Sequence, residues 1–285
     1  MLILLNRIIL IIFISIVSFS VHSEETNTNY VKTNWSFKGI FGTFDRASLQ
    51  RGYQVYQEVC SGCHSVKHLS YRNLLEKGGP EFSVEEAKAI AAQFEVEDGP
   101  NRDGEMFIRS GRLSDQFIKP YPNVEASKAA NGGAYPPDMS VLAKARAGGA
   151  DYIYSLLLGY EDTPAGFELD DGVYYNKYMP GNKIKMSVPL VDGLVEYSDG
   201  TNSTTAQMAK DVTTFLVWTS EPHLESQHKM GFKAIIYLII LFTLVYMSKQ
   251  KIWARFGNEN IEEEVFDKVE KAVTEYEGED PKTFK

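Results

Sequence analysis

The two cysteines of this 285-residue chain lie three residues apart and are followed at once by a histidine, in Cys60-Ser61-Gly62-Cys63-His64. On a helical turn, residues three apart share a face, so both sulfurs can bond to the vinyl edges of one porphyrin. His64 would then lie beneath the iron as its proximal ligand. The motif therefore predicts one haem c, attached covalently through Cys60 and Cys63.

Three other readings of this motif are a disulfide, a thioredoxin-like redox pair and half of a zinc site. A thioredoxin-like pair is typical of a βαβ context, and a zinc site needs two further ligands. The chain has no further cysteine, and of its histidines only His68 is near in sequence. Because His68 lies four residues past His64, on the same helix face, it cannot reach the opposite side of the ring. We expect it to be a surface residue.

The N-terminal residues 1–23 have the features of a secretory signal peptide. Arg7 precedes an apolar run over residues 8–17, and small residues lie near Ser23, after which we expect cleavage. An uncleaved N-terminal anchor is the alternative. In both cases the segment 24–229, which carries the haem motif, is expected to be an exported haem domain.

A second apolar run extends from Phe232 to Ser248, with basic residues on both sides. As a helix it would rise about 25 Å, slightly less than the roughly 30 Å hydrocarbon core of a bilayer. We interpret residues 230–249 as a transmembrane anchor, with a buried helix of a soluble domain as the alternative. The cluster Lys249, Lys251 and Arg255 predicts that the C-terminal side faces the cytoplasm.

The remaining residues 250–285 form an acidic cytoplasmic tail in this interpretation. A disordered tail is favoured over a short amphipathic helix through Ile261, Val265, Val269 and Val273. The whole chain has 38 acidic and 29 basic residues and a net charge of −9. This charge argues against a nucleic-acid partner. It leaves open whether the acidic residues form a patch for a basic protein or only a solvated surface.

The helical periodicity and capping residues predict a mainly α fold with long irregular insertions and one C-terminal transmembrane helix. The expected helices are Arg46–Val59, Ser65–Leu75, Ser83–Phe94, Asp138–Ala147, Asp151–Leu158 and Ser203–Thr219. Ser83 and Glu86 have the capping-box spacing, and Asp138 is the expected cap of its helix. The long segments 96–137 and 167–189 show no clear period and are expected to be irregular.

A haem that transfers electrons normally has a second axial ligand, and a thioether sulfur favours ferrous iron. The candidates in the exported part are Met106, Met139, Met179, Met186 and Met208. Met208 lies on a helical stripe and Met139 at the start of a helix, so both are expected to pack in the core. Met179 and Met186 share an irregular segment, and their spacing alone does not decide between them.

Several long stretches of the chain, in this order, resemble the cytochrome c1 family, the haem subunit of ubiquinol–cytochrome c reductase. They are RGYQVYQEVCSGCH, VEDGPNRDGEMF, NGGAYPPDMS, ARAGGADYIYSLLLGY, YYNKYMPGNKIKM and FLVWTSEP, followed by the basic-flanked anchor. The resemblance implies a cytochrome c-type domain in which Met186 is the axial sulfur and Arg146 pairs with a haem propionate. It also implies that Asn131, Pro137 and Tyr152 line the pocket. Lys183 and Lys185 make the ligand loop more charged than is usual in the family.

The resemblance further implies an electron relay without catalytic side chains of its own. One electron would come from a Rieske iron–sulfur protein and pass to a soluble or membrane-bound cytochrome c. Cytochrome b would be the partner in the lipid bilayer of a bacterial inner membrane, within a dimeric complex, and the haem domain would lie in the periplasm. Two rivals are a haem peroxidase, for which no distal histidine is evident, and a haem-based sensor, for which the tail has no recognisable output domain.

Overall fold

The computed structural model describes residues 29–254 and 260–277. The predicted signal peptide, residues 1–23, lies outside this range. The chain divides into one unit that ends at Glu225 and a second that begins at Ser226.

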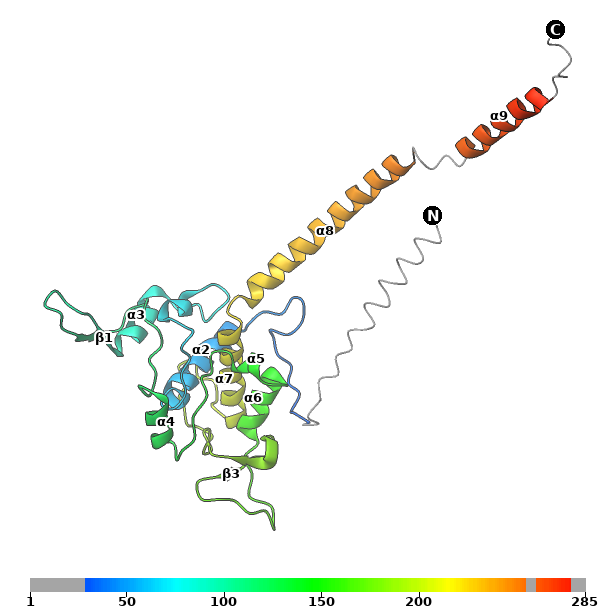
Figure 1. Ribbon diagram of the computed structural model, residues 1–285. Coiled ribbons are helices and arrows are strands. Elements are labelled where there is room, and N and C mark those ends of the chain that lie inside the picture. The colour runs from blue at the N-terminus through cyan, green and yellow to red at the C-terminus, as the bar shows by residue number, and fades with distance from the viewer. Residues whose placement is uncertain (1–28, 255–259, 278–285) are drawn as a thin grey trace, which may run out of the picture. The chain divides into compact units, whose positions relative to one another are not determined.

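The first unit is mainly helical, as predicted, with two short antiparallel strand pairs (Figure 1). Its α-helices are α2 (Arg46–Val55), α3 (Val84–Ala92), α4 (Val124–Ala130), α5 (Leu142–Ala145), α6 (Gly149–Leu158) and α7 (Thr205–Ser220). Strand β1 (Glu95–Asp98) pairs with β2 (Phe107–Ser110), and β3 (Tyr174–Tyr175) pairs with β4 (Lys183–Ile184).

The core lies where α2 packs along α7. The apolar stripe predicted for the first helix was Leu49, Tyr53, Tyr56 and Val59, and the first three are buried while Val59 is partly buried against the core. The set predicted for the last helix is buried throughout: Met208, Val212, Phe215, Leu216 and Trp218. The two backbones approach closely at Gly52, where an added Cβ would come within 2.1 Å of the Asp211 carbonyl oxygen. Only glycine fits this contact without a shift of the helices.

A buried carboxylate joins the same two helices. Asp211, which is fully buried, accepts hydrogen bonds from Ser48 Oγ at 2.7 Å and Arg51 Nε at 2.9 Å. Arg51 also donates to Asp199 at 2.7 Å. A buried charge is tolerated only when it is paired and hydrogen-bonded, so this network fixes the rotation of α2 against α7. Helix α2 leads directly to the C-X-X-C-H motif.

The helix predicted from Ser83 is confirmed as α3. Ser83 Oγ accepts from the Glu86 backbone N–H at 3.2 Å, and the Glu86 carboxylate accepts from the Ser83 N–H at 2.8 Å. This reciprocal pair is the predicted capping box. The helix predicted over Ser65–Leu75 is wrong for its first half, because only Tyr71–Leu75 is helical, as a 3-10 turn.

The segment 96–137 is more regular than predicted. It contains the β1–β2 hairpin and α4, whose N-cap Asn123 accepts from the Ala126 N–H at 2.8 Å. The hairpin was missed because its two strands are only four residues long and neither has a buried position to mark an apolar face. Its connection contains Gly99-Pro100, which indicates loop structure in a sequence.

Asp138 does not cap a helix, and the helix predicted from it is reduced to the four residues of α5. Its carboxylate instead accepts from Ser65 Oγ at 2.6 Å and from the Lys67 N–H at 3.1 Å. The cap prediction failed because a partner 73 residues away competes for the carboxylate. Helix α6 begins as expected near Asp151, after Gly148 at φ +88°, where an added Cβ would lie 2.6 Å from the Tyr30 ring.

Helix α8 (Leu224–Trp253) contains the predicted anchor. Its most apolar window has a mean hydropathy of 2.1 with no part buried, and it is the one helix among the described residues that is long and apolar enough to cross a membrane. The tail was favoured as disordered, and this is wrong for α9 (Asn260–Glu277). Acidic residues follow Asn260, where they favour a helix N-terminus, and the valines at four-residue spacing form the amphipathic stripe that was the alternative.

Candidate haem-binding site

The C-X-X-C-H motif is wound into the C-terminal end of the α2 helix. After Val55 the chain continues through a wider π-helical turn, Tyr56–Cys60, in which the Ser61 N–H donates to the Tyr56 carbonyl at 2.8 Å. The N–H groups of Cys63 and His64 both donate to the Cys60 carbonyl, at 3.1 and 2.9 Å. The two thiols and the imidazole therefore belong to one closed turn.

Both cysteines are free thiols, Cys60 half-buried and Cys63 exposed. Burial, with a smaller contribution from Cys63, raises the pKa of the Cys60 thiol to about 12. A redox pair of the thioredoxin kind needs a lowered thiol pKa, so this environment does not fit that alternative. Within the described ranges, no three His, Cys, Asp or Glu residues are grouped as a metal site would require, so the zinc alternative lacks ligands.

His64 is oriented by a carbonyl 73 residues away. Its Nδ1 lies 2.8 Å from the Pro137 oxygen, and because a carbonyl only accepts, Nδ1 must carry the proton. The lone pair of Nε2 is then left for a metal, as in most histidine ligands. Burial lowers the pKa of His64, against the opposing effect of the Pro137 hydrogen bond, and keeps the imidazole neutral near pH 7.

The loop around Pro137 is fastened to the residues that follow His64. Besides the Asp138 contacts with Ser65 and Lys67, the Met139 N–H donates to the Ser65 carbonyl at 2.7 Å. Burial works to raise the pKa of Asp138, but the hydrogen bonds from Ser65, Lys67 and Ser140 outweigh it and lower this pKa. The carboxylate thus stays ionised and holds Pro137 against His64.

Met186, half-buried, lies on the loop after β4. The Tyr160 hydroxyl donates to the Met186 carbonyl at 3.1 Å, which ties this loop to the end of α6. Fully buried Asn176 strengthens the tie, because its side-chain amide donates to the Leu156 carbonyl of α6 at 2.8 Å. Of the other methionines, Met139 and Met208 are buried as predicted, and Met106 is 55% exposed.

The remaining predicted pocket residues lie on the loops and helices around this loop. Tyr152 is buried in α6, with its hydroxyl 4.0 Å from the Met179 sulfur. Burial raises the pKa of Tyr152, and the nearby Arg146 guanidinium opposes this rise. Arg146 itself is exposed and donates to the Ala145 carbonyl at 3.1 Å. Asn131 is turned toward α4, where its amide donates to the Ser127 carbonyl at 2.7 Å.

Sequence reasoning missed Tyr160, Asn176 and the role of Met179 as a neighbour of Tyr152. Tyr160 follows Gly159, the C-cap of α6, and an aromatic at that point gave no periodic signal. These contacts link residues 20 to 27 positions apart, so only the folded chain reveals them. His68 is exposed, as predicted.

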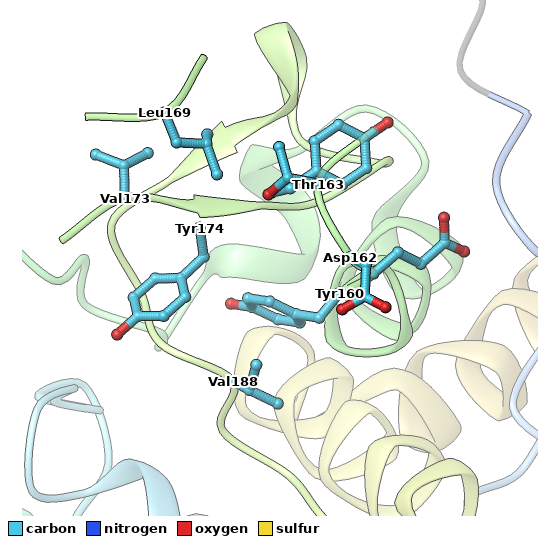
Figure 2. A pocket seen from close by; sticks show the side chains of 9 residues that line it. Tyr160, Asp162, Thr163, Leu169, Val173, Tyr174 and Val188 are labelled. Carbon is cyan, nitrogen blue, oxygen red and sulfur yellow. The ribbon is translucent and has the colours of Figure 1, made fainter. Parts of the chain in front are cut away.

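Beside the Met186 loop lies an open cleft of about 810 Å³. Figure 2 shows Tyr160 and Val188 on one side and Leu169 and Val173 on the other, and Asp162 also lines the cleft. The cleft is lined by apolar and aromatic side chains together with Glu161 and Asp162, and Glu161 is paired with Lys177.

The donor set fits a haem: two free thiols and a neutral imidazole in one turn, and a thioether on the separate loop after β4. The fold and the site together define the class as that of membrane-anchored haem cytochromes. The model of the Cytochrome C1 family matches residues 35–256, and the chain belongs to this family.

Several relatives are similar over most of the chain. Cytochrome b/c1 of Bradyrhizobium diazoefficiens is 48% identical over 239 residues, which cover 77% of this chain and 35% of that longer protein. The mitochondrial cytochrome c1-2 haem protein of Solanum tuberosum is 49% identical over 220 residues, 77% of this chain and 84% of its own. The mitochondrial cytochrome c1 haem protein of Schizosaccharomyces pombe is 48% identical over 238 residues, 84% of this chain and 76% of its own.

Proposed function

We propose that this chain relays single electrons from a Rieske iron–sulfur protein to a cytochrome c. The family membership supports the coarser statement that it is a haem electron-transfer subunit of a cytochrome b–c1 complex. The observation that carries the proposal is the imidazole of His64, neutral and with one nitrogen engaged by Pro137, next to two free thiols.

In this function, Cys60 and Cys63 hold the haem through thioether bonds, and His64 and Met186 bind its iron from opposite sides. The haem supplies a reversible ferric–ferrous couple when bound. The side chains make and break no bonds during transfer. Pro137 and Asp138 fix the imidazole, and Tyr160 fixes the loop that carries the sulfur.

Four further residues complete the proposed pocket. The exposed guanidinium of Arg146 has five N–H donors, of which one donates to the Ala145 carbonyl, and the others would bind a propionate. Tyr152, in α6, lies beside the Arg146 guanidinium. Asn131 and Pro137, on the loop after α4, would line another side of the haem pocket. The carboxylate of Asp162 in the cleft beside the Met186 loop supports a basic cytochrome c as the electron acceptor (Figure 2).

The membrane arrangement is proposed from the sequence of α8. Its apolar span anchors the chain beside cytochrome b, in a dimeric complex of a bacterial inner membrane. The basic residues after the span favour a cytoplasmic C-terminus and a periplasmic haem domain.

The function is tested with the full-length chain in its membrane complex by rapid-mixing spectroscopy of the c-type haem. A quinol should reduce this haem within a turnover, and added ferric cytochrome c should reoxidise it. Tight carbon monoxide binding to the reduced haem, or peroxide turnover at it, would instead indicate an open catalytic site and contradict the relay.

A further inference from the structure

Lys185, next to Met186, is one of the two lysines that make the ligand loop unusually charged. Its Nζ donates to the Gly132 carbonyl oxygen at 2.9 Å, across 53 residues of sequence. An added Cβ on Gly133 would lie 3.9 Å from the same nitrogen. The ammonium is therefore seated on the Gly132-Gly133 turn.

The turn that receives Lys185 is itself fixed. Gly132 and Gly133 have φ angles of +57° and +82°, which rotate the carbonyl in a way that other residues rarely allow. The Gly133 N–H donates to the Lys128 carbonyl of α4 at 2.8 Å, and the Asn131 amide donates to the Ser127 carbonyl. Lys185 thus reaches a turn that α4 holds in place.

The turn belongs to the loop that runs on to Pro137, the residue that orients His64. Lys185 belongs to the loop that carries Met186, whose other tie is the Tyr160 hydroxyl. The hydrogen bond between Lys185 and Gly132 is therefore a direct link between the loop supporting the imidazole and the loop carrying the sulfur.

Lys183, two residues earlier, provides a contrast. Its ammonium lies 3.7 Å from the Asp170 carboxylate and 5.8 Å from the centre of the Phe167 ring. Lys185 has no ion pair with a described carboxylate, and its ammonium donates to a neutral carbonyl instead. The two lysines lie one and three residues before Met186 and differ in where their side chains are bound.

We propose that Lys185 is a positioning residue that braces the Met186 loop against the Gly132 turn and so keeps the thioether sulfur on the iron. The inference rests on the proposed function, because it requires Met186 to be the axial ligand. The brace restrains the loop at the residue before the sulfur, while Tyr160 restrains it at the carbonyl after the sulfur. The positive charge of the Lys185 ammonium also disfavours the ferric state of the haem iron, which carries one more positive charge than the ferrous state.

The test compares Lys185→Ala with Lys183→Ala in the full-length chain within its membrane complex. Carbon monoxide binding to the reduced haem and imidazole binding to the oxidised haem report how often the sulfur leaves the iron. We expect the rate of ligand binding to rise about tenfold or more in Lys185→Ala and to stay within about twofold of the parent in Lys183→Ala. The midpoint potential should fall further in Lys185→Ala than in Lys183→Ala.

Lys185→Arg keeps both the charge and the donor, so it should restore slow ligand binding. The content of covalently bound haem shows that each variant is assembled. Equal ligand-binding rates in the two alanine variants, or fast binding in Lys185→Arg, would overturn the brace.

Met186→Leu separates this inference from the function on which it rests. Fast ligand binding in Met186→Leu together with slow binding in Lys185→Ala would reject the brace alone. Slow binding in Met186→Leu would reject the ligand assignment itself.

Discussion

At the scale of single residues, the proposed haem site depends on His64 and Met186, which would bind iron, and on the groups that orient them. His64 needs Pro137 to present Nε2, and Met186 needs its loop to be held at Tyr160. Neither orienting contact is local in sequence. The residue chemistry can therefore be tested one side chain at a time.

Replacing Met186 with leucine should remove the thioether while preserving the apolar volume. Because sulfur favours ferrous iron, we expect the midpoint potential to fall by on the order of 0.1 V, within the roughly 0.8 V range that axial ligands set. Redox titration of the c-type haem measures the fall. Met106→Leu, at an exposed position of the β1–β2 hairpin, should leave the potential unchanged, and an unchanged potential in both variants would exclude Met186 as ligand.

Asp151 should make part of the domain's stability depend on acid pH. Burial works to raise its pKa, but hydrogen bonds from Trp35 at 2.6 Å and Lys38 at 3.1 Å outweigh it and lower this pKa. A lowered carboxyl pKa gives stability that is present above about pH 4 and lost as pH falls through the folded-state value.

Asp151→Asn keeps a hydrogen-bond acceptor for Trp35 but removes the charge. We expect a loss of about 1–2 kcal/mol at pH 7 and a flatter decline of unfolding free energy below pH 4. Denaturant titrations followed by tryptophan fluorescence measure both. Asp103→Asn, at an exposed loop position, is the control, and an equal acid dependence in parent and Asp151→Asn would show that Asp151 carries no such linkage.

At the scale of elements, the pairing of α2 with α7 positions the haem motif. Gly52→Ala would force a Cβ to within 2.1 Å of the Asp211 carbonyl oxygen, so the helices must separate. We expect a loss of about 1–3 kcal/mol of unfolding free energy, as for other overpacked contacts. Gly62→Ala meets no atom within 4 Å and should be nearly neutral in thermal unfolding. Equal unfolding temperatures for the two variants would contradict the close packing.

The sequence predicted most of the helices but not the contacts between loops. Helices α2, α3, α6 and α7 were predictable because their caps and apolar stripes are local signals. Asp138 was misread as a cap because its carboxylate binds Ser65 and Lys67, 71 to 73 residues away, besides the nearby Ser140 N–H. The haem motif and the methionine candidates were visible as residue types. The contacts of Pro137 with His64 and of Lys185 with Gly132 depend on loop packing, which no local pattern encodes.

At the scale of the whole molecule, a haem domain is followed by one apolar helix and then by α9. Helix α8 begins within the first unit, where the Glu225 carboxylate accepts two hydrogen bonds from Arg46, at 2.8 and 2.9 Å. Arg46 is the first residue of α2, the helix that leads to the C-X-X-C-H motif. The start of α8 is therefore hydrogen-bonded to α2 within the first unit.

The central claim is that one porphyrin is bonded to both cysteines beside His64. It is tested most directly by mass spectrometry of the peptide spanning residues 57–66, prepared from membranes of cells that attach haem to proteins. The account predicts that this peptide carries one haem added across Cys60 and Cys63. Recovery of the same peptide with two unmodified thiols or with an internal disulfide would contradict it.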